Sequence, residues 1–215
     1  MDLSAALEAR CRALDLPYDA AWARPIGVHL DLLARWSQVM NLTTVASPEE
    51  ALERHVVDSL ALLRLDAVST SRGPAADLGS GAGFPGLPLA IALPDVDWTL
   101  IEPRRKRGVF LQKAIHESGV KNARWLEASL PDPRLADRYA LVVSRATFPP
   151  QDLLAMAAPL LAPGGALAVM AATPPEWDLS GWRLIEQASL RIAGAPRWLG
   201  AVRRAGAECQ AESLC

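Results

Sequence analysis

Glu102 and a run of glycines are the residues of this sequence best suited to binding a ligand. In the segment DLGSGAGFPG, residues 77–86, Gly79, Gly81 and Gly83 alternate directly after a short apolar run. Because glycine costs roughly 0.5–1 kcal/mol relative to alanine in regular structure, this spacing indicates a turn that a ligand approaches closely. In α/β folds such a turn, between a strand and a helix, binds nucleotide-like ligands. Glu102 ends the next predicted strand, where a carboxylate can accept hydrogen bonds from both hydroxyls of a ribose.

Two cofactor patterns fit the glycine run. Gly81-x-Gly83-x-x-Gly86 satisfies the dinucleotide pattern. Asp77-x-Gly79-x-Gly81-x-Gly83 satisfies that of S-adenosylmethionine (SAM) methyltransferases, in which the acid ends the strand and the glycines approach the methionine part of the cofactor. A tight turn without a ligand is the third interpretation. The ribose-binding acid is common to both cofactors and does not distinguish them.

From residue 75 onward, predicted strands and helices alternate, and they would position this turn. The predicted strands are 74–79, 96–102, 121–129, 139–146 and 166–172, with a final pair at 181–190 and 197–205. The predicted helices between them are 84–94, 104–119 and 151–165, the last ending at a glycine pair. This alternation predicts an α/β fold with a mostly parallel seven-strand sheet covered by helices on both faces.

The chain divides into three predicted parts. Residues 1–70 read as a helical N-terminal extension, residues 71–205 as the ligand-binding domain and residues 206–215 as a C-terminal tail. Within the extension, Ser47 and Pro48 form a helix-start signature, with Ser47 as the cap and Pro48 at the first helical position.

Composition narrows the function classes. The 215 residues are 51% hydrophobic and 21% charged, with a net charge of −2, so a general attraction for nucleic acid is excluded while a local basic patch is allowed. Cys11, Cys209 and Cys215 lack metal-ligand spacing, which indicates reduced thiols and no metal site. The first residues contain no apolar signal region, and prolines and glycines interrupt the longest apolar stretch. We therefore expect a cytoplasmic protein without a membrane span.

Several segments together resemble the small-subunit ribosomal RNA methyltransferase G family, also called glucose-inhibited division protein B. They are NLTTVASPEEALERHVVDSLAL, DLGSGAGFPGLPLAI, RRKRGVFLQKA and VVSRA, in order from about residue 36 to 170, and LLAPGGALAVM is similar to the late strands of class I methyltransferases. The resemblance implies a class I (Rossmann-like) SAM fold with a helical N-terminal extension. It also implies methyl transfer to N7 of a guanine in 16S rRNA, as free RNA or in a small-subunit particle, by an enzyme that we expect to be monomeric.

The resemblance extends to individual residues. It places Asn41, His55, Asp58 and Arg145 as positioning candidates, with no residue assigned to proton transfer. The expected cofactor-binding residues are Asp77, Gly79, Ser80, Gly81, Phe84, Glu102, Leu130 and Arg145. The expected RNA-binding residues are Arg104, Arg105, Lys106, Arg107 and Arg197.

One departure from the family pattern concerns the substrate. A Lys-Gly step commonly ends the strand after Pro-Gly-Gly, whereas this sequence has Met170-Ala171-Ala172. Arg183, Arg197 or Arg203 would then supply the positive charge. Two alternatives stay open from the sequence: a SAM-dependent methyltransferase of a small molecule or protein, and a nicotinamide-dependent oxidoreductase.

Overall fold

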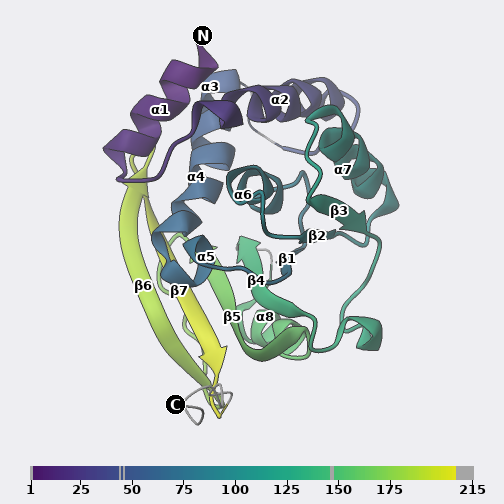
Figure 1. The fold of residues 1–215 in the computed structure, drawn as a ribbon, viewed down its shortest axis with the longest axis vertical. Coiled ribbons are helices and arrows are strands. Elements are labelled where there is room, and N and C mark those ends of the chain that lie inside the picture. Colours follow the sequence, from purple (N-terminus) through teal and green to yellow (C-terminus); the bar gives the residue numbers. More distant parts are fainter. Residues whose placement is uncertain (1, 44, 46, 146–147, 207–215) are drawn as a thin grey trace.

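A seven-stranded, mostly parallel sheet forms the centre of the protein in this computed structural model (Figure 1). The structure describes residues 2–43, 45, 47–145 and 148–206. The strands are β1 (Ala75–Leu78), β2 (Trp98–Ile101), β3 (Ala123–Leu126), β4 (Tyr139–Arg145), β5 (Leu161–Ala171), β6 (Trp182–Ile192) and β7 (Ala195–Arg204). Their order is β3-β2-β1-β4-β5-β7-β6, with β7 antiparallel to both neighbours. The predicted α/β fold class, including the final pair of strands, is confirmed.

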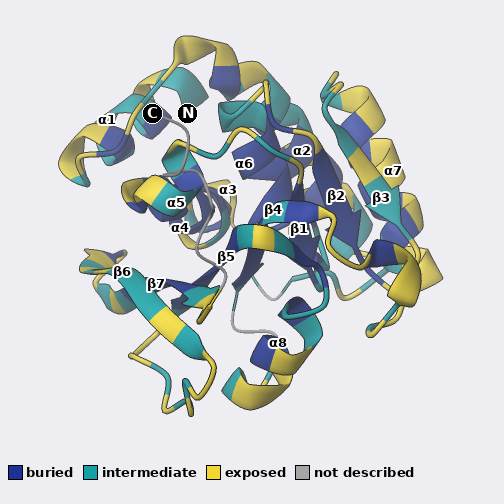
Figure 2. Ribbon diagram, turned by 60° about the horizontal axis from the view of Figure 1, so that its bottom comes forward, coloured by how far each residue is buried: buried dark blue, intermediate teal, exposed yellow. Residues whose placement is uncertain are grey.

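Helices cover both faces of this sheet, whose central strands are buried (Figure 2). The α-helices are α1 (Leu3–Ala13), α2 (Ala23–Ser37), α3 (Pro48–Ala51), α4 (Asp58–Leu60), α5 (Asp66–Ser69), α6 (Gly86–Ala92), α7 (Arg105–Glu117) and α8 (Pro150–Ala157). Three 3₁₀ turns, η1 (Ala20–Trp22), η3 (Ala61–Arg64) and η4 (Pro133–Leu135), and one π-helical turn, η2 (Leu52–Val57), complete the helical elements of the described residues.

The side chains of successive strand residues divide the core into two layers. Ala75 of β1 and its partner Leu141 of β4 belong to a hydrophobic cluster with α1, α2, α6 and α7. The next pair, Ala76 and Val142, belongs to a second cluster with α8. Neighbouring strand residues point to opposite faces, so each strand contributes to both layers. Helices before β1 (α1 and α2) and helices after it (α6 and α7) share the first cluster, and the division of the chain at residue 70 stays a prediction.

The helical stretch before β1 begins as expected and contains an irregular turn. Ser47 Oγ accepts a hydrogen bond from the Glu50 amide at 3.1 Å, and Pro48 occupies the first helical position. Immediately afterwards, Leu52–Val57 wind as the π-helical turn η2. Such turns occur rarely and are frequent at functional sites. His55 lies in this turn.

The predicted helix at 151–165 is wrong in its second half. Helix α8 ends at Ala157, and β5 already begins at Leu161, so the Pro-Gly-Gly segment belongs to the strand. Pro159 ends the helix because proline cannot donate a backbone hydrogen bond within it. A Cβ on Gly165 would lie 2.8 Å from the Tyr139 carbonyl oxygen, and the pairing of β4 with β5 shifts register here. The glycine therefore allows the two strand backbones to approach each other.

The last two strands form a hairpin near the end of the chain. Strands β6 and β7 are joined by Ala193 and Gly194, both with positive φ (49° and 77°), as a two-residue hairpin turn requires. Cys11 is buried and free, whereas Cys209, Cys215 and the rest of 207–215 lie outside the described residues. Among the described residues, no helix has both the length and the hydropathy to cross a bilayer.

Candidate active site

The glycine-rich turn leaves β1 in a conformation that requires its glycines. Gly79, Gly81 and Gly83 have φ values of 71°, 56° and 91°, a region that other residues rarely adopt. A Cβ added at Gly81 would meet nothing closer than 3.8 Å, where Arg107 Nη1 and the Gly79 carbonyl oxygen lie. The backbone at Gly81 is therefore bounded mainly by the end of a flexible side chain, and a ligand can approach it there.

Asp77 and Ser80 hold this turn from inside the core. Asp77 Oδ2 accepts a hydrogen bond from the Gly86 amide at 2.9 Å, and Ser80 Oγ donates to the Asp77 carbonyl oxygen at 3.0 Å. Both side chains are buried. Burial raises the pKa of Asp77 to about 6, and the hydrogen bond from Gly86 opposes the rise. The Asp77 carboxylate therefore supports the turn, and its expected role in cofactor binding stays a prediction.

Glu102 links the end of β2 to the glycine turn. Its Oε2 accepts a hydrogen bond from the Gly81 amide at 3.1 Å, and its Oε1 accepts one from the Arg104 amide at 2.9 Å. Arg107 Nη1 lies 3.9 Å from the same Oε2. A carboxylate has about four lone-pair sites, so these two backbone bonds leave capacity for two further donors. Glu102 can therefore accept hydrogen bonds from two further donors beside Gly81.

A second polar cluster lies at the carboxyl end of β4. Arg145 ends that strand, with Nη1 3.9 Å from Asp58 Oδ2 and 3.4 Å from His55 Nδ1. Arg197 Nε binds Asp58 Oδ1 at 2.7 Å. Burial raises the pKa of Asp58, and the hydrogen bond and charge of Arg197 oppose that rise. Two guanidinium groups therefore share one buried carboxylate.

His55 is held as a neutral imidazole in this cluster. Its pKa is lowered to about 4, first by burial and then by the charge of Arg145. Because Arg145 can only donate, Nδ1 is the acceptor of that contact. Nε2 then carries the proton and donates to Thr43 Oγ1 at 2.7 Å. At neutral pH, His55 is therefore oriented at both nitrogens and adds no charge.

The cluster opens into a cavity of about 350 Å³. Its size falls in the range of small-ligand sites. The predicted positioning residues His55, Asp58 and Arg145 meet here. The lining residues are Val45, Arg54, His55, Asp58, Arg145, Met170, Ala171, Ala172 and Arg197.

Of the arginines expected to replace the missing lysine charge, Arg197 lies at this cavity, beside Met170. Arg183 and Arg203 pair with each other at the opposite end of the β6–β7 hairpin. The Arg197 side chain is 17% exposed and bound to Asp58, and its expected role in RNA binding stays a prediction.

Phe84 connects the glycine turn with the polar cluster through its ring. The ring stacks on His55 with centroids 4.8 Å apart, and Arg145 Cζ lies 5.5 Å from its centroid. His29 stacks on it at 4.6 Å. The ring thus contacts these three side chains and is buried. A contact of Phe84 with a cofactor, as expected from the sequence, would therefore involve its backbone.

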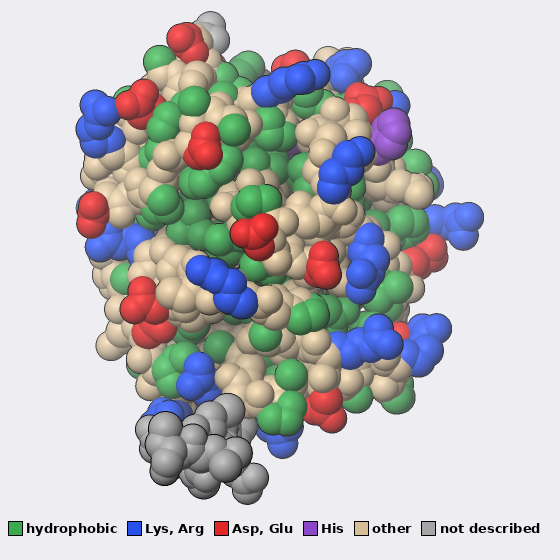
Figure 3. All heavy atoms as spheres, in the orientation of Figure 1, with side chains coloured by type: hydrophobic (Ala, Val, Ile, Leu, Met, Phe, Trp, Pro, Cys, Tyr) green, Lys and Arg blue, Asp and Glu red, His purple; other side chains and the backbone are tan. Residues whose placement is uncertain are grey.

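The predicted run of basic residues, Arg104 to Arg107, lies at the start of α7. Arg104 is the residue before the helix, and Arg105, Lys106 and Arg107 form its first turn, which contains no acid. The Arg105 side chain is 82% exposed, whereas Arg107 turns toward Glu102. Figure 3 shows Lys and Arg interspersed with Asp and Glu over this face of the molecule. Within this mixed distribution, the start of α7 has four consecutive basic residues, Arg104 to Arg107.

Two predicted residues are not brought into either cluster. Asn41 is exposed in the segment after α2. Leu130 is partly buried against the second hydrophobic cluster. Their expected roles stay predictions. Among the described residues, no three His, Cys, Asp or Glu side chains gather as a metal-binding group.

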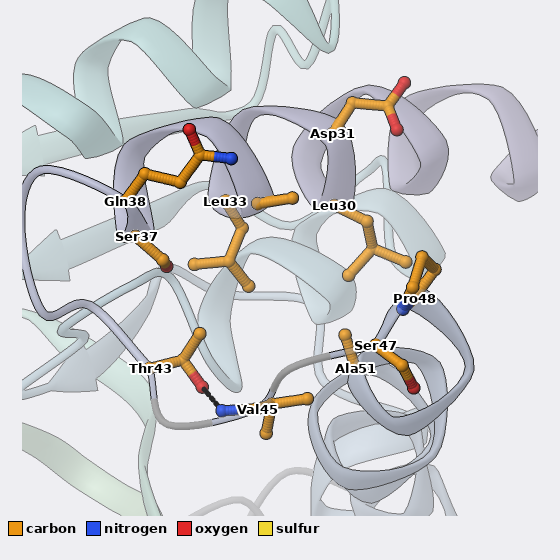
Figure 4. Close-up of a pocket in the computed structure, with 11 residues that line it drawn as sticks. Leu30, Asp31, Leu33, Ser37, Gln38, Thr43, Val45, Ser47, Pro48 and Ala51 are labelled. Carbon is orange, nitrogen blue, oxygen red and sulfur yellow. Dashed lines mark hydrogen bonds between the residues drawn. The ribbon is translucent and has the colours of Figure 1, made fainter.

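Thr43 and His29 contact the residues of the site, although neither was among the site residues expected from the sequence. Thr43 Oγ1 also accepts from the Val45 amide at 3.1 Å, at the rim of a further cavity of about 400 Å³ between α2 and residues 43–51 (Figure 4). That cavity is lined by apolar residues such as Leu30 and Leu33 and by polar ones such as Asp31 and Gln38. The Asn-Leu-Thr-Thr segment was a signal for Thr43, but His29 had none.

Comparison with known proteins agrees with this geometry. Residues 25–182 match the family described as rRNA small subunit methyltransferase G. A protein named ribosomal RNA small subunit methyltransferase G from Stenotrophomonas maltophilia is 37% identical over 180 residues, covering 82% of this chain and 83% of that protein. One of the same name from Xanthomonas oryzae is 36% identical over 213 residues, covering 95% and 96%.

Solved structures resemble the fold. A SAM-dependent methyltransferase from Aquifex aeolicus has a TM-score of 0.56 at 15% identity, covering 75% of this chain and 96% of that one. A precorrin-6y C5,15-methyltransferase from Geobacter metallireducens has a TM-score of 0.52 at 14% identity, covering 75% and 92%. At these identities the likeness concerns the fold alone.

Proposed function

Because the chain belongs to the rRNA small subunit methyltransferase G family, we propose that it transfers a methyl group from SAM to N7 of a guanine in 16S rRNA. The observation that carries the proposal is the adjacency of two sites at the carboxyl ends of the strands. Glu102 and Gly81 form the first, and the cavity at Arg145 forms the second. The ring of Phe84 lies between them in contact with Arg145. Ligands of open α/β sheets bind at this edge.

The first site fits SAM in the chemistry of its donors and acceptors. The backbone at Gly79 and Gly81 can approach the methionine part, and Glu102 has capacity for both ribose hydroxyls. Arg107, at 3.8 Å from the position of a Gly81 Cβ, is the flexible group that would have to make room. When bound, SAM supplies an electrophilic methyl group on a sulfonium. The chain's own residues orient it.

The second site suits a base that has left its stack. Guanine N7 presents a lone pair and carries no proton, so no general base is needed. The neutral His55 and the paired Asp58 agree with that requirement, since neither is poised to remove a proton. The chain's contribution is then to place N7 in line with the methyl group, and Arg145 and Arg197 can donate to the oxygens of the nucleotide. Displaced bases of this kind are what RNA-modifying enzymes bind.

The start of α7 supports a role in holding the RNA backbone. Positive charges in the first turn of a helix oppose its dipole, each costing about 0.3–1 kcal/mol at an exposed site. Arg105 and Lys106 have this unfavourable placement, which a phosphate anion would reverse. We assign Arg104, Arg105 and Lys106 to phosphate contacts, which position RNA without reading its bases.

Neither alternative activity is favoured by family membership. We further propose that the protein acts as a monomer in the cytoplasm, where its ribosomal substrate is found.

The proposal is tested by methyl transfer from labelled SAM. Small-subunit rRNA and intact small subunits from a strain lacking this modification are offered separately, with large-subunit rRNA as the control acceptor. We expect label in one or both small-subunit substrates and none in the control. Equal labelling of all three, or binding of NADH without binding of SAM, would overturn the proposal.

A further inference from the structure

His29 is a buried polar residue that the proposed chemistry does not use. It lies on α2, which packs against α6 and α7 (Figure 1), and its side chain is fully buried. An imidazole transferred into an apolar layer loses its hydrogen bonds to water, which is costly unless they are replaced. The ring nitrogens of His29 therefore need hydrogen-bond partners within the protein.

One nitrogen of His29 holds the glycine-rich turn. His29 Nε2 lies 2.8 Å from the Ala82 carbonyl oxygen. A carbonyl oxygen can only accept, so Nε2 carries the proton and donates. His29 Nδ1 is buried without a partner among the described residues. Burial lowers the pKa of His29 to about 4, so a neutral ring with a single donor faces the turn at neutral pH.

The rest of the ring lies against the two residues that follow Ala82. It stacks on Phe84 with an interplanar angle of 21°. A Cβ added at Gly83 would lie 3.3 Å from both Cε1 and Nε2 of His29. One side chain of the helical layer therefore contacts three consecutive residues of the turn, whose other half includes Gly79 and Gly81.

We infer that His29 is a positioning residue for SAM binding, which fixes the Ala82–Phe84 half of the glycine-rich turn through its hydrogen bond to the Ala82 carbonyl. The inference rests on the proposed function. By this route, the affinity for SAM depends on the docking of α2 against the turn. Because His55 stacks on the other side of Phe84, the same contact helps to place the residues at the second cavity.

Two substitutions separate the hydrogen bond from the filling of space. His29→Phe keeps an aromatic ring for stacking and removes the donor. His29→Gln keeps an amide donor on a side chain of similar reach and removes the ring. If the hydrogen bond carries the effect, the Gln variant retains more SAM affinity than the Phe variant.

The control variant is Leu160→Ala. Leu160 is fully buried in the second hydrophobic cluster, and its carbonyl oxygen bonds the Tyr139 amide at the amino end of β4. Leu160 lies at the end of the strands opposite to the glycine-rich turn, so this substitution lowers the free energy of unfolding without altering a contact of the turn. It therefore reports what destabilisation alone does to SAM binding.

The experiment measures SAM affinity by calorimetry and amide hydrogen exchange of residues 79–84 without ligand. We expect His29→Phe to weaken SAM about 3- to 10-fold, equal to about 0.7–1.4 kcal/mol at 1.4 kcal/mol per factor of ten. Exchange at 79–84 should be faster in this variant, and both effects should be smaller in His29→Gln. Leu160→Ala should change neither.

Two results overturn the inference and are distinct from failure of the proposed function. If His29→Phe binds SAM as well as the parent, or if Leu160→Ala weakens SAM equally, His29 is only a core residue. If the parent itself does not bind SAM, the proposed function fails first. The exchange measurement still reports in that case, because it requires no ligand.

Discussion

Replacing Glu102 by glutamine should weaken SAM binding about 10- to 100-fold. The carboxylate already accepts hydrogen bonds from the Gly81 and Arg104 amides, and its remaining capacity matches two ribose hydroxyls. Each hydrogen bond to a charged group contributes about 1.5–3 kcal/mol. Glutamine keeps one acceptor oxygen and carries no charge, so about one of the two hydrogen bonds to the ribose is lost. A loss of about 1.5–3 kcal/mol in binding free energy corresponds to one to two factors of ten in affinity, at about 1.4 kcal/mol each.

Glutamine also has a structural cost that must be measured separately. Its amide NH₂ group has to face one of the two backbone amides, so one buried donor loses its acceptor, at about 1–3 kcal/mol. Thermal unfolding of Glu102→Gln without ligand reports this cost. Glu127→Gln is the matched control, because Glu127 follows β3 but is 46% exposed and lies 3.8 Å from Arg105.

The assay is calorimetric titration with S-adenosylhomocysteine and with its analogue lacking both ribose hydroxyls. If Glu102 binds the hydroxyls, the parent should prefer the complete ligand, and Glu102→Gln should lose that preference. A folded Glu102→Gln variant with parental affinity would refute the assignment. So would an equal loss of affinity for both ligands, since Glu102 would then act only on the turn.

The remaining predictions concern RNA, the buried ion pair and acid stability. Replacing Arg104 and Arg105 by alanine should reduce the slope of log K against log[salt] for rRNA binding by about 0.7–0.9 per phosphate contact and leave SAM affinity unchanged. Filter binding between about 50 and 200 mM salt measures this slope, and an unchanged slope would rule out phosphate contacts. Asp58→Ala leaves Arg197 without its 2.7 Å partner, so we expect a lower midpoint of denaturant unfolding and a lower kcat, with SAM affinity retained; a parental kcat would remove this pair from the site. Because the pKa of His29 falls from 6.5 to about 4 on folding, the unfolded chain binds its proton more readily, and the free energy of unfolding should fall as pH drops from about 6.5 to 4. The loss is about 3 kcal/mol at most, and urea unfolding of His29→Phe should show a flatter profile; a profile as steep as the parent's would contradict the pKa shift.

The sequence predicted the parts of the fold that depend on local chemistry. Alternating glycines, the helix cap at Ser47 and the apolar strands each act within a few residues, and the structure confirms the turn, the cap and the sheet. The Pro-Gly-Gly segment was misassigned because its role is not local. Gly165 is required by the neighbouring strand, through the Tyr139 carbonyl, and not by the end of a helix.

The candidate site was predictable as a set of residues more than as an arrangement. His55 and Arg145 were selected and do meet at one cavity. The contacts that orient them join distant parts of the chain, such as Asp58 with Arg197 and His29 with Ala82. Spacing along the sequence carries no information about such pairs. For the same reason, the sequence offered Arg183, Arg197 and Arg203 equally as the source of a positive charge, whereas the fold places only Arg197 of these three beside the buried carboxylate of Asp58.

The most direct test of the account is methyl transfer to small-subunit rRNA transcribed with 7-deazaguanosine, offered as free RNA or reassembled into small subunits, whichever form accepts label with normal rRNA. This nucleotide has a carbon in place of N7 and therefore no lone pair there, while its Watson–Crick edge is unchanged. A transcript with 7-deazaadenosine is the control for altered stacking. The account predicts labelled 7-methylguanosine in the normal and 7-deazaadenosine transcripts and no transfer to the 7-deazaguanosine transcript. Undiminished transfer to the 7-deazaguanosine transcript would contradict it, because the methyl group would then have another acceptor.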